Sequence, residues 1–122
     1  MSQMLLSINP EHVENILLGK KKFELRKVRC REDVDTIIIY ATFPVMKVVA
    51  EAEVLDVIED HPNDVWDIVS EYAGISKGFF DKYYEGKDKA VAYHLGRVKE
   101  YSIPKTLSDY GINFAPQSFV YV

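Results

Sequence analysis

Three side chains in the N-terminal part of the sequence have the types and spacing needed to bind a phosphorylated ligand. Lys21, Glu24 and Arg26 stand three and two residues apart, immediately after a predicted helix. Arg26 can bind phosphate through two parallel hydrogen bonds, and Lys21 can act as a point charge on phosphate or on a base carbonyl. Glu24 can accept hydrogen bonds from the amino or ring N–H groups of a base. The set predicts a site for a nucleotide or RNA, with one alternative: Glu24 and Arg26 share a strand face and can pair with each other.

Other residues, which lie later in the chain, can complete such a site. Tyr40 offers an aromatic ring on which a base can stack, as Tyr93 also does. Thr42 is the nearest hydroxyl, so we expect Tyr40 or Thr42 to line the same pocket as the first three residues. Gln117 can read the edge of a base with its amide. The structural alternatives are that Tyr40 is a core residue and that Gln117 satisfies backbone groups in a loop.

The elements that must position these residues follow from the hydrophobic pattern. The apolar residues 4–8 predict a strand, and Asn9 and Pro10 are typical of the start of a helix, which Gly19 ends. In the next segment, 22–28, apolar and charged residues alternate, which predicts a strand with Phe23, Leu25 and Val28 on its inner face. The lysine, glutamate and arginine of the candidate site then lie around its polar face.

The rest of the chain alternates between strands and short helices. Residues 35–43 and 48–57 predict two long strands that pair with each other. Two amphipathic helices follow, one opening at Pro62 or Asn63 and the other covering residues 77–84. A strand over 90–102, stopped by Pro104, a helical turn over 106–111 and a strand at the C-terminus complete the pattern. The sequence predicts the α+β class: a small mixed β-barrel of five or six strands with about three peripheral helices.

Length and composition limit the class of protein. The chain has 122 residues, of which 48% are hydrophobic and 28% charged, so we expect one globular domain over residues 1–122. No apolar run approaches the roughly 20 residues of a membrane-spanning helix. The first residues lack the charged start and cleavage site of a secretory leader, so we expect a cytoplasmic protein without membrane contact. The sequence leaves the oligomeric state open.

The net charge of −4 is unevenly distributed. Residues 1–31 carry seven Lys or Arg against three acids, and all seven basic residues lie within 20–31. The remaining residues carry eight basic groups against sixteen acids. This basic stripe can attract phosphate locally. Its alternatives are a solvated edge strand protected by lysines and a contact surface for an acidic protein.

The order of several short motifs resembles the ASCH domain family of the PUA-like superfamily. The motifs are Leu5-Leu6-Ser7-Ile8-x-Pro10, Gly19-x-Lys21-x-x-Glu24-x-Arg26, Tyr40-Ala41-Thr42-x-Pro44 and Ala115-Pro116-Gln117-Ser118-Phe119. The resemblance implies a PUA-like β-barrel with a cleft beside the second motif. It also implies a domain that binds RNA or a nucleotide, in some relatives with a regulatory role. Ribonuclease activity is attributed to other relatives.

A hydrolase is the alternative function that the resemblance raises. Some small relatives are acetylcytidine amidohydrolases, whose threonine nucleophile stands three residues after the motif lysine. Here that position is Glu24, which cannot replace a hydroxyl nucleophile, so we do not expect that activity. A hydrolase acting on a nucleoside or RNA would need a different set of residues. The enzyme assignment therefore stays open, and we name no catalytic residue.

Neither a metal nor a cofactor is predicted. The acidic residues on the strand 48–60 alternate in the manner of surface residues, although Glu51, Glu53, Asp56 and Asp60 would be the candidates for a metal-dependent nuclease. The three histidines lack the spacing of metal ligands. Cys30 is a single cysteine, which excludes an internal disulfide and a cysteine-rich zinc site.

Overall fold

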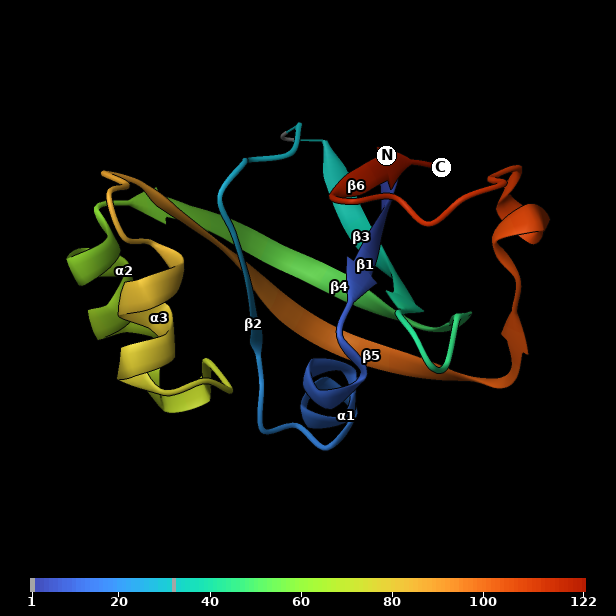
Figure 1. Cartoon of the computed structure of the whole chain (residues 1–122), viewed down its shortest axis with the longest axis horizontal. Coiled ribbons are helices and arrows are strands. Elements are labelled where there is room, and N and C mark those ends of the chain that lie inside the picture. Colours follow the sequence, from blue (N-terminus) through green and yellow to red (C-terminus); the bar gives the residue numbers. More distant parts are fainter. Residues whose placement is uncertain (1, 32) are drawn as a thin grey trace.

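A single strongly curled sheet forms the framework of the computed structural model, which describes residues 2–31 and 33–122. The strands are β1 (Ser2–Ile8), β2 (Phe23–Arg26), β3 (Val34–Ala41), β4 (Lys47–Asp60), β5 (Ala90–Lys105) and β6 (Phe119–Tyr121). The helices are α1 (Pro10–Leu17), α2 (Pro62–Val69) and α3 (Lys77–Tyr83), with short 3₁₀ turns at Ser70–Tyr72 and Leu107–Tyr110. The protein is therefore α+β, a six-stranded half-barrel with three α-helices, as the sequence predicts (Figure 1).

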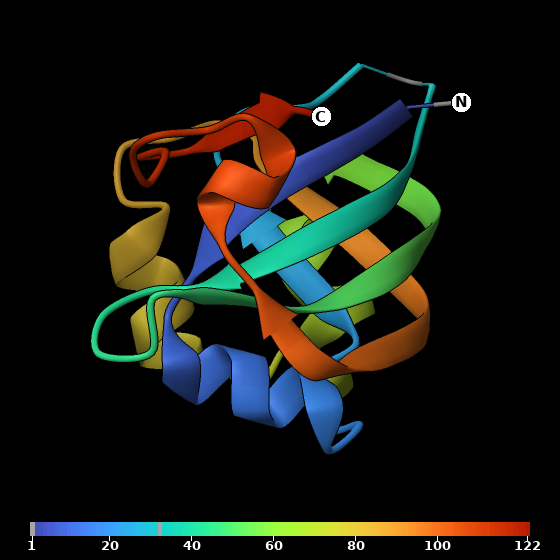
Figure 2. The same ribbon diagram turned by 90° about the vertical axis from the view of Figure 1, so that its right-hand side faces the viewer.

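The order of strands in the sheet is β2-β5-β4-β3-β1-β6. β1 and β3 run parallel, and every other neighbouring pair is antiparallel. β3 and β4 pair as expected. The sheet curls until its first and fifth strands, β2 and β1, face each other across an open seam (Figures 1 and 2).

Three apolar clusters stabilise this arrangement. The largest fills the inside of the curl with side chains from β1, α1, β3, β4 and β5, including Tyr93. A second cluster lies between β2, β5 and the helices α2 and α3, and is centred on Phe80 and Tyr84. A third packs Tyr40 with Leu5 and Val48 under the segment that leads to β6.

Local sequence signals explain most element boundaries. Asn9 caps α1 by accepting a hydrogen bond from the Glu11 amide, and Pro10 occupies the first turn. α2 begins at Pro62, one of the two predicted starts, and His61 caps it by accepting a hydrogen bond from the Asn63 amide. The α-helix ends at Val69 and continues as a 3₁₀ turn over Ser70–Tyr72.

Several predicted strand ends are wrong: β3 ends at Ala41 and not at residue 43, and β4 runs to Asp60 and not to residue 57. β5 continues through Pro104 to Lys105. β2 pairs only with Val91–His94 of β5, so the later residues of β5 have a neighbouring strand on one side only. Such an edge tolerates a residue without an N–H group. β2 ends at Arg26, and Val28, expected on the inner face, is 59% exposed.

None of the helices in the described residues has the length and apolar character needed to cross a membrane.

Gly74, which lies shortly before α3, packs closely against Lys21. It has φ +71°, and a Cβ added there would lie 2.7 Å from the Cβ of Lys21. Gly86 has a similar φ of +76° but nothing within 4 Å of an added Cβ. Because Gly74 has no side chain, the stem of Lys21 can pass directly beneath the segment that joins α2 to α3.

We expect Gly74→Ala to destabilise the protein more than Gly86→Ala. Both substitutions place an alanine in the left-handed region, at a cost of about 1–2 kcal/mol. Only Gly74→Ala adds overpacking against Lys21, which costs a further 1–3 kcal/mol or so. Urea denaturation of the two variants measures the difference, and equal losses would contradict the packing argument.

Candidate functional site

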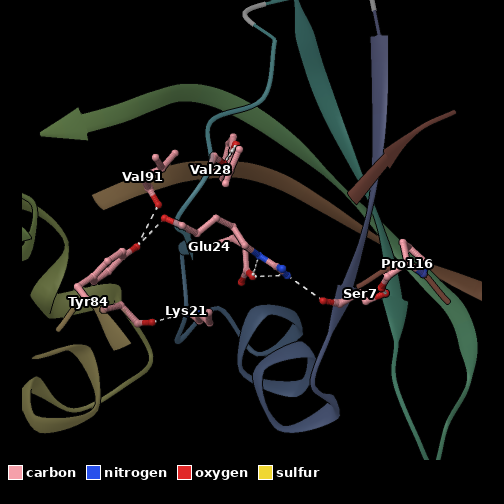
Figure 3. Close-up of polar contacts among 10 residues, drawn as sticks. Ser7, Lys21, Glu24, Val28, Tyr84, Val91 and Pro116 are labelled. Carbon is pink, nitrogen blue, oxygen red and sulfur yellow. Dashed lines mark hydrogen bonds and ion pairs between the residues drawn. The ribbon is translucent and has the colours of Figure 1, made fainter. Parts of the chain in front are cut away.

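The residues from Lys21 to Arg26 lie along the seam between β1 and β2. The amide of Lys22 donates a hydrogen bond to the Tyr72 carbonyl, and the Lys22 carbonyl accepts one from the Leu95 amide. This short segment is thereby held between the helical segment 61–89 on one side and β5 on the other. Its Glu24 side chain points into the seam, where the contact with Arg26 reaches Ser7 at the end of β1 (Figure 3).

Arg26 bridges the seam. Its Nε donates to Glu24 Oε2 at 2.9 Å, and its Nη2 lies 2.9 Å from the same oxygen. Nη2 also donates to the Ser7 carbonyl at 2.8 Å, on a strand that is not a neighbour of β2 in the sheet. The Glu24 side chain is 7% exposed and that of Arg26 17%. The alternative predicted from the sequence, that these two residues pair, is therefore realised, and the pair itself lines a cleft.

Lys21 is buried beside this pair. Its Nζ donates a hydrogen bond to the Ala73 carbonyl at 2.6 Å, and the residue is 4% exposed. Burial lowers the pKa of Lys21 from its ordinary value; Glu24 opposes this decrease and Arg26 adds to it. The alternative of a solvated edge strand holds for Lys22, which is exposed, and does not hold for Glu24, which is buried.

A cleft of about 180 Å³ opens above these side chains. Its polar side is formed by side chains from the end of β1, the start of α1 and β2, and its apolar side by side chains at and before α3. The lining residues are Ser7, Ile8, Asn9, His12, Lys21, Glu24, Leu25, Arg26, Ile75, Phe79 and Tyr83. The rings of Phe79 and Tyr83 are nearly parallel, 13° apart with centroids 6.5 Å apart. The cleft thus combines charged side chains with two aromatic rings.

Sequence reasoning did not identify His12 as part of the site. Its Nδ1 is buried and has no hydrogen-bond partner among the described residues. Its ring meets Phe79 edge-on at 6.2 Å, so it joins the polar and aromatic sides of the cleft. The available signal was its place three residues after the helix cap Asn9, which puts both side chains at the same end of α1.

The other candidate residues lie elsewhere. Tyr40 is 3% exposed in the third core cluster, and Tyr93 is fully buried with its hydroxyl bonded to the backbone of Cys30 and Val28. Neither ring is open for stacking. Thr42 and Gln117 do not line the cleft but adjoin it: the Thr42 amide donates to the Ile8 carbonyl, and Gln117 follows Pro116, whose carbonyl accepts from Ser7. The expectation that Tyr40 or Thr42 lines the pocket is therefore wrong.

The basic stripe 20–31 does not form one continuous patch. Lys22 lies over the Tyr72 ring at 4.3 Å, Lys27 over Tyr83 at 4.6 Å, and Arg31 over Tyr121 at 3.9 Å. These rings belong to different parts of the molecule. The cations of the stripe are distributed around the edge of the sheet, and only Lys21 and Arg26 reach the cleft.

The acidic residues of β4 do not gather into a metal site. Glu51 accepts a hydrogen bond from the Tyr101 hydroxyl, and Asp56 lies 3.6 Å from His94. No three His, Cys, Asp or Glu residues in the described ranges are placed to hold one ion together. Cys30 is a free, buried thiol.

The buried lysine makes stability depend on pH. The pKa of Lys21 is lower in the folded protein than in the unfolded chain. Between these two pKa values the unfolded chain binds more protons than the folded protein, so the free energy of unfolding increases as the pH rises toward 10.5. We expect the wild type to gain stability relative to Lys21→Met between neutral pH and 10.5. Urea denaturation of both proteins across this range gives the difference, from which the tyrosines common to both cancel. A difference that does not change with pH would contradict the assignment.

The part of the chain that forms this cleft matches a known protein family. The model of the ASCH domain matches residues 6–104, which include the cleft-lining residues from both of its sides. The crystal structure of ASCH from Zymomonas mobilis superposes with a TM-score of 0.89 at 27% identity, covering 98% of this chain and 87% of that one.

Relatives found by sequence carry different names. A protein named ASCH domain-containing ribonuclease from Zymomonas mobilis is 31% identical over 94 residues, 76% of this chain and 64% of that protein. A segment of a protein named large ribosomal subunit protein uL22, from Ureaplasma parvum, is 37% identical over 86 residues, which is 70% of this chain but only 28% of that protein. The chain thus spans about a quarter of that longer relative. The shared segment, the matched family model and the common fold agree: this chain belongs to the ASCH domain family.

Proposed function

We propose that the protein binds RNA by holding one nucleotide unit in the cleft of Lys21, Glu24 and Arg26. The observation that carries the proposal is the composition of the cleft: two cations and a carboxylate on one side face two nearly parallel aromatic rings on the other. Nucleotides combine an anionic phosphate, a flat base and N–H donors, and this cleft offers a partner for each. The relative named ribonuclease supports RNA as the polymer.

Each side chain has a distinct role in this proposal. Arg26, whose side chain is more exposed than that of Glu24, binds phosphate oxygens, and the buried Lys21 contributes a second positive charge. Both contacts of Glu24 with Arg26 use Oε2, so Oε1 can accept from an amino or ring N–H group of the base. Phe79 and Tyr83 form the surface against which the base lies.

Substitution of the charged pair tests the proposal. We expect Arg26→Gln to weaken binding of a single-stranded RNA octamer about 10- to 100-fold, since a hydrogen bond to a charged group contributes about 1.5–3 kcal/mol. Glu24→Gln should alter base preference more than overall affinity. Fluorescence anisotropy with labelled homopolymeric octamers measures both effects, with thermal unfolding used to confirm that each variant folds.

Lys99→Gln serves as the matched control, since it removes one positive charge from the exposed surface of β5, outside the cleft. If it weakens binding as much as Arg26→Gln, the binding is non-specific and the cleft is not the site. The wild-type affinity should also decrease with salt. Two to four phosphate contacts predict a slope of log K against log salt of about −1.4 to −2.8 for single strands.

Cleavage of the bound RNA is a second candidate function, favoured by His12. Its unpartnered, buried Nδ1 is a group of the type that accepts a proton from a 2′-hydroxyl, and it lines the same cleft as the two cations. The Ser7 hydroxyl is less available, because it donates to the Pro116 carbonyl at 2.7 Å. Glu24 is held by Arg26 and has no hydroxyl to act as an acyl acceptor.

If the protein cleaves RNA, we expect His12→Ala to reduce the rate at least about 100-fold while RNA binding changes little. Gel analysis of a labelled oligonucleotide gives the rate, and anisotropy gives the affinity. Cleavage that is equally fast with the wild type and with His12→Ala would exclude this role for the histidine.

A further inference from the structure

Two exposed aromatic side chains lie beside the cleft and take no part in its lining. Phe43, in the loop between β3 and β4, is 80% exposed, and Phe114, in the segment before β6, is 66% exposed. Burial of an aromatic side chain is strongly favourable, so two such rings in water are available for a partner. We call the segments 42–47 and 113–117 that carry them the aromatic rim.

Hydrogen bonds attach both parts of the rim to the wall of the cleft. The Thr42 amide donates to the Ile8 carbonyl at 3.0 Å, one residue before Phe43. The Ser7 hydroxyl donates to the Pro116 carbonyl at 2.7 Å, two residues after Phe114. Ser7 and Ile8 both line the cleft. The rim is therefore attached to the end of β1, on the side of that strand that faces away from α3 (Figure 1).

The charge around the rim suits an anionic partner. Residues 36–50 contain no acidic side chain and one basic side chain, Lys47, while residues 110–122 contain no charged side chain at all. In a chain of net charge −4, this leaves the rim free of the carboxylates that would repel phosphate. Lys47 is exposed and has no ion-pair partner among the described residues.

The size of the cleft limits what it can hold. Its volume of about 180 Å³ is below the roughly 300–1,000 Å³ of ordinary small-molecule pockets, so it holds no more than one nucleotide unit. A longer RNA bound there therefore has to continue outside the cleft.

We propose that the aromatic rim is a stacking platform for the nucleotides that flank the one in the cleft, with Phe43 and Phe114 contacting bases and Lys47 contacting a phosphate. This inference rests on the proposed function and extends it: the preferred ligand is single-stranded RNA of several nucleotides. Stacking on exposed rings requires bases that are free of pairing, so a duplex is a poor ligand. Thr42 and Gln117, which adjoin the cleft without lining it, then lie where they can contact the flanking nucleotides.

The test compares an octamer with a mononucleotide. Fluorescence anisotropy measures the labelled single-stranded RNA octamer, and competition against it measures nucleoside 5′-monophosphates. We expect Phe43→Ala to weaken octamer binding roughly 5- to 100-fold, the effect of losing one base–aromatic stack. Monophosphate binding should be unchanged. Phe43→Leu should lose as much as Phe43→Ala, and Phe43→Trp should retain octamer binding, because stacking needs a flat ring and not merely an apolar group.

Ile68→Ala is the matched control, because Ile68 is an apolar residue on α2, 56% exposed and outside the cleft. It should leave both affinities unchanged. If Phe43→Ala and the double variant with Phe114→Ala bind the octamer as tightly as the wild type while Arg26→Gln weakens it, the rim proposal is overturned and the proposed function stands. If the wild type binds neither ligand, both are overturned.

The oligomeric state provides a second check. Sedimentation of the wild type without RNA should give the same species as Phe43→Ala. Formation of a dimer that Phe43→Ala dissociates would show that the rim binds a second copy of the chain, which would overturn the proposal.

Discussion

The contact of Arg26 with Glu24 and with the Ser7 carbonyl determines how the sheet is closed. β2 and β1 are not neighbours, and the guanidinium group supplies the connection that backbone hydrogen bonds do not. Both side chains are largely shielded from water, and loss of one partner from a buried pair costs about 3–5 kcal/mol. The cleft lies over this bridge, so the interaction that holds the two strand edges together also provides charged groups to the cleft wall.

Lys21 adds a second constraint from the opposite side. Its ammonium group is bound by the Ala73 carbonyl, and its stem passes against Gly74, so the segment between α2 and α3 must approach β2 closely. The Tyr84 hydroxyl donates to the Arg26 carbonyl and fixes the end of α3 to the same strand. Together these contacts determine where Phe79 and Tyr83 stand relative to the charged residues. The apolar and polar sides of the cleft are thus positioned by one short strand.

Much of the fold could be predicted from the sequence because its signals are local. Alternation of apolar residues identified the strands, and Asn9, Pro10 and Gly19 marked the ends of the first helix. The motif of Lys21, Glu24 and Arg26 also identified three cleft residues through the family resemblance. Contacts between distant segments could not be read in this way. His12 and Phe79 meet across the cleft only because α1 and α3 converge there. The cluster that buries Tyr40 combines Leu5, on β1, with residues more than sixty positions later in the chain.

The helical segment 61–89 leaves and re-enters the sheet at adjacent positions. Its flanking residues Asp60 and Ala90 are paired across β4 and β5. Because both ends are fixed at one point of a two-stranded ribbon, the segment can change in length or sequence with little effect on the strand register, at a small entropic cost. Within such an architecture, one wall of the cleft can diversify while the charged floor is retained. The shape and polarity of the cleft can therefore change through the exchange of a single insertion.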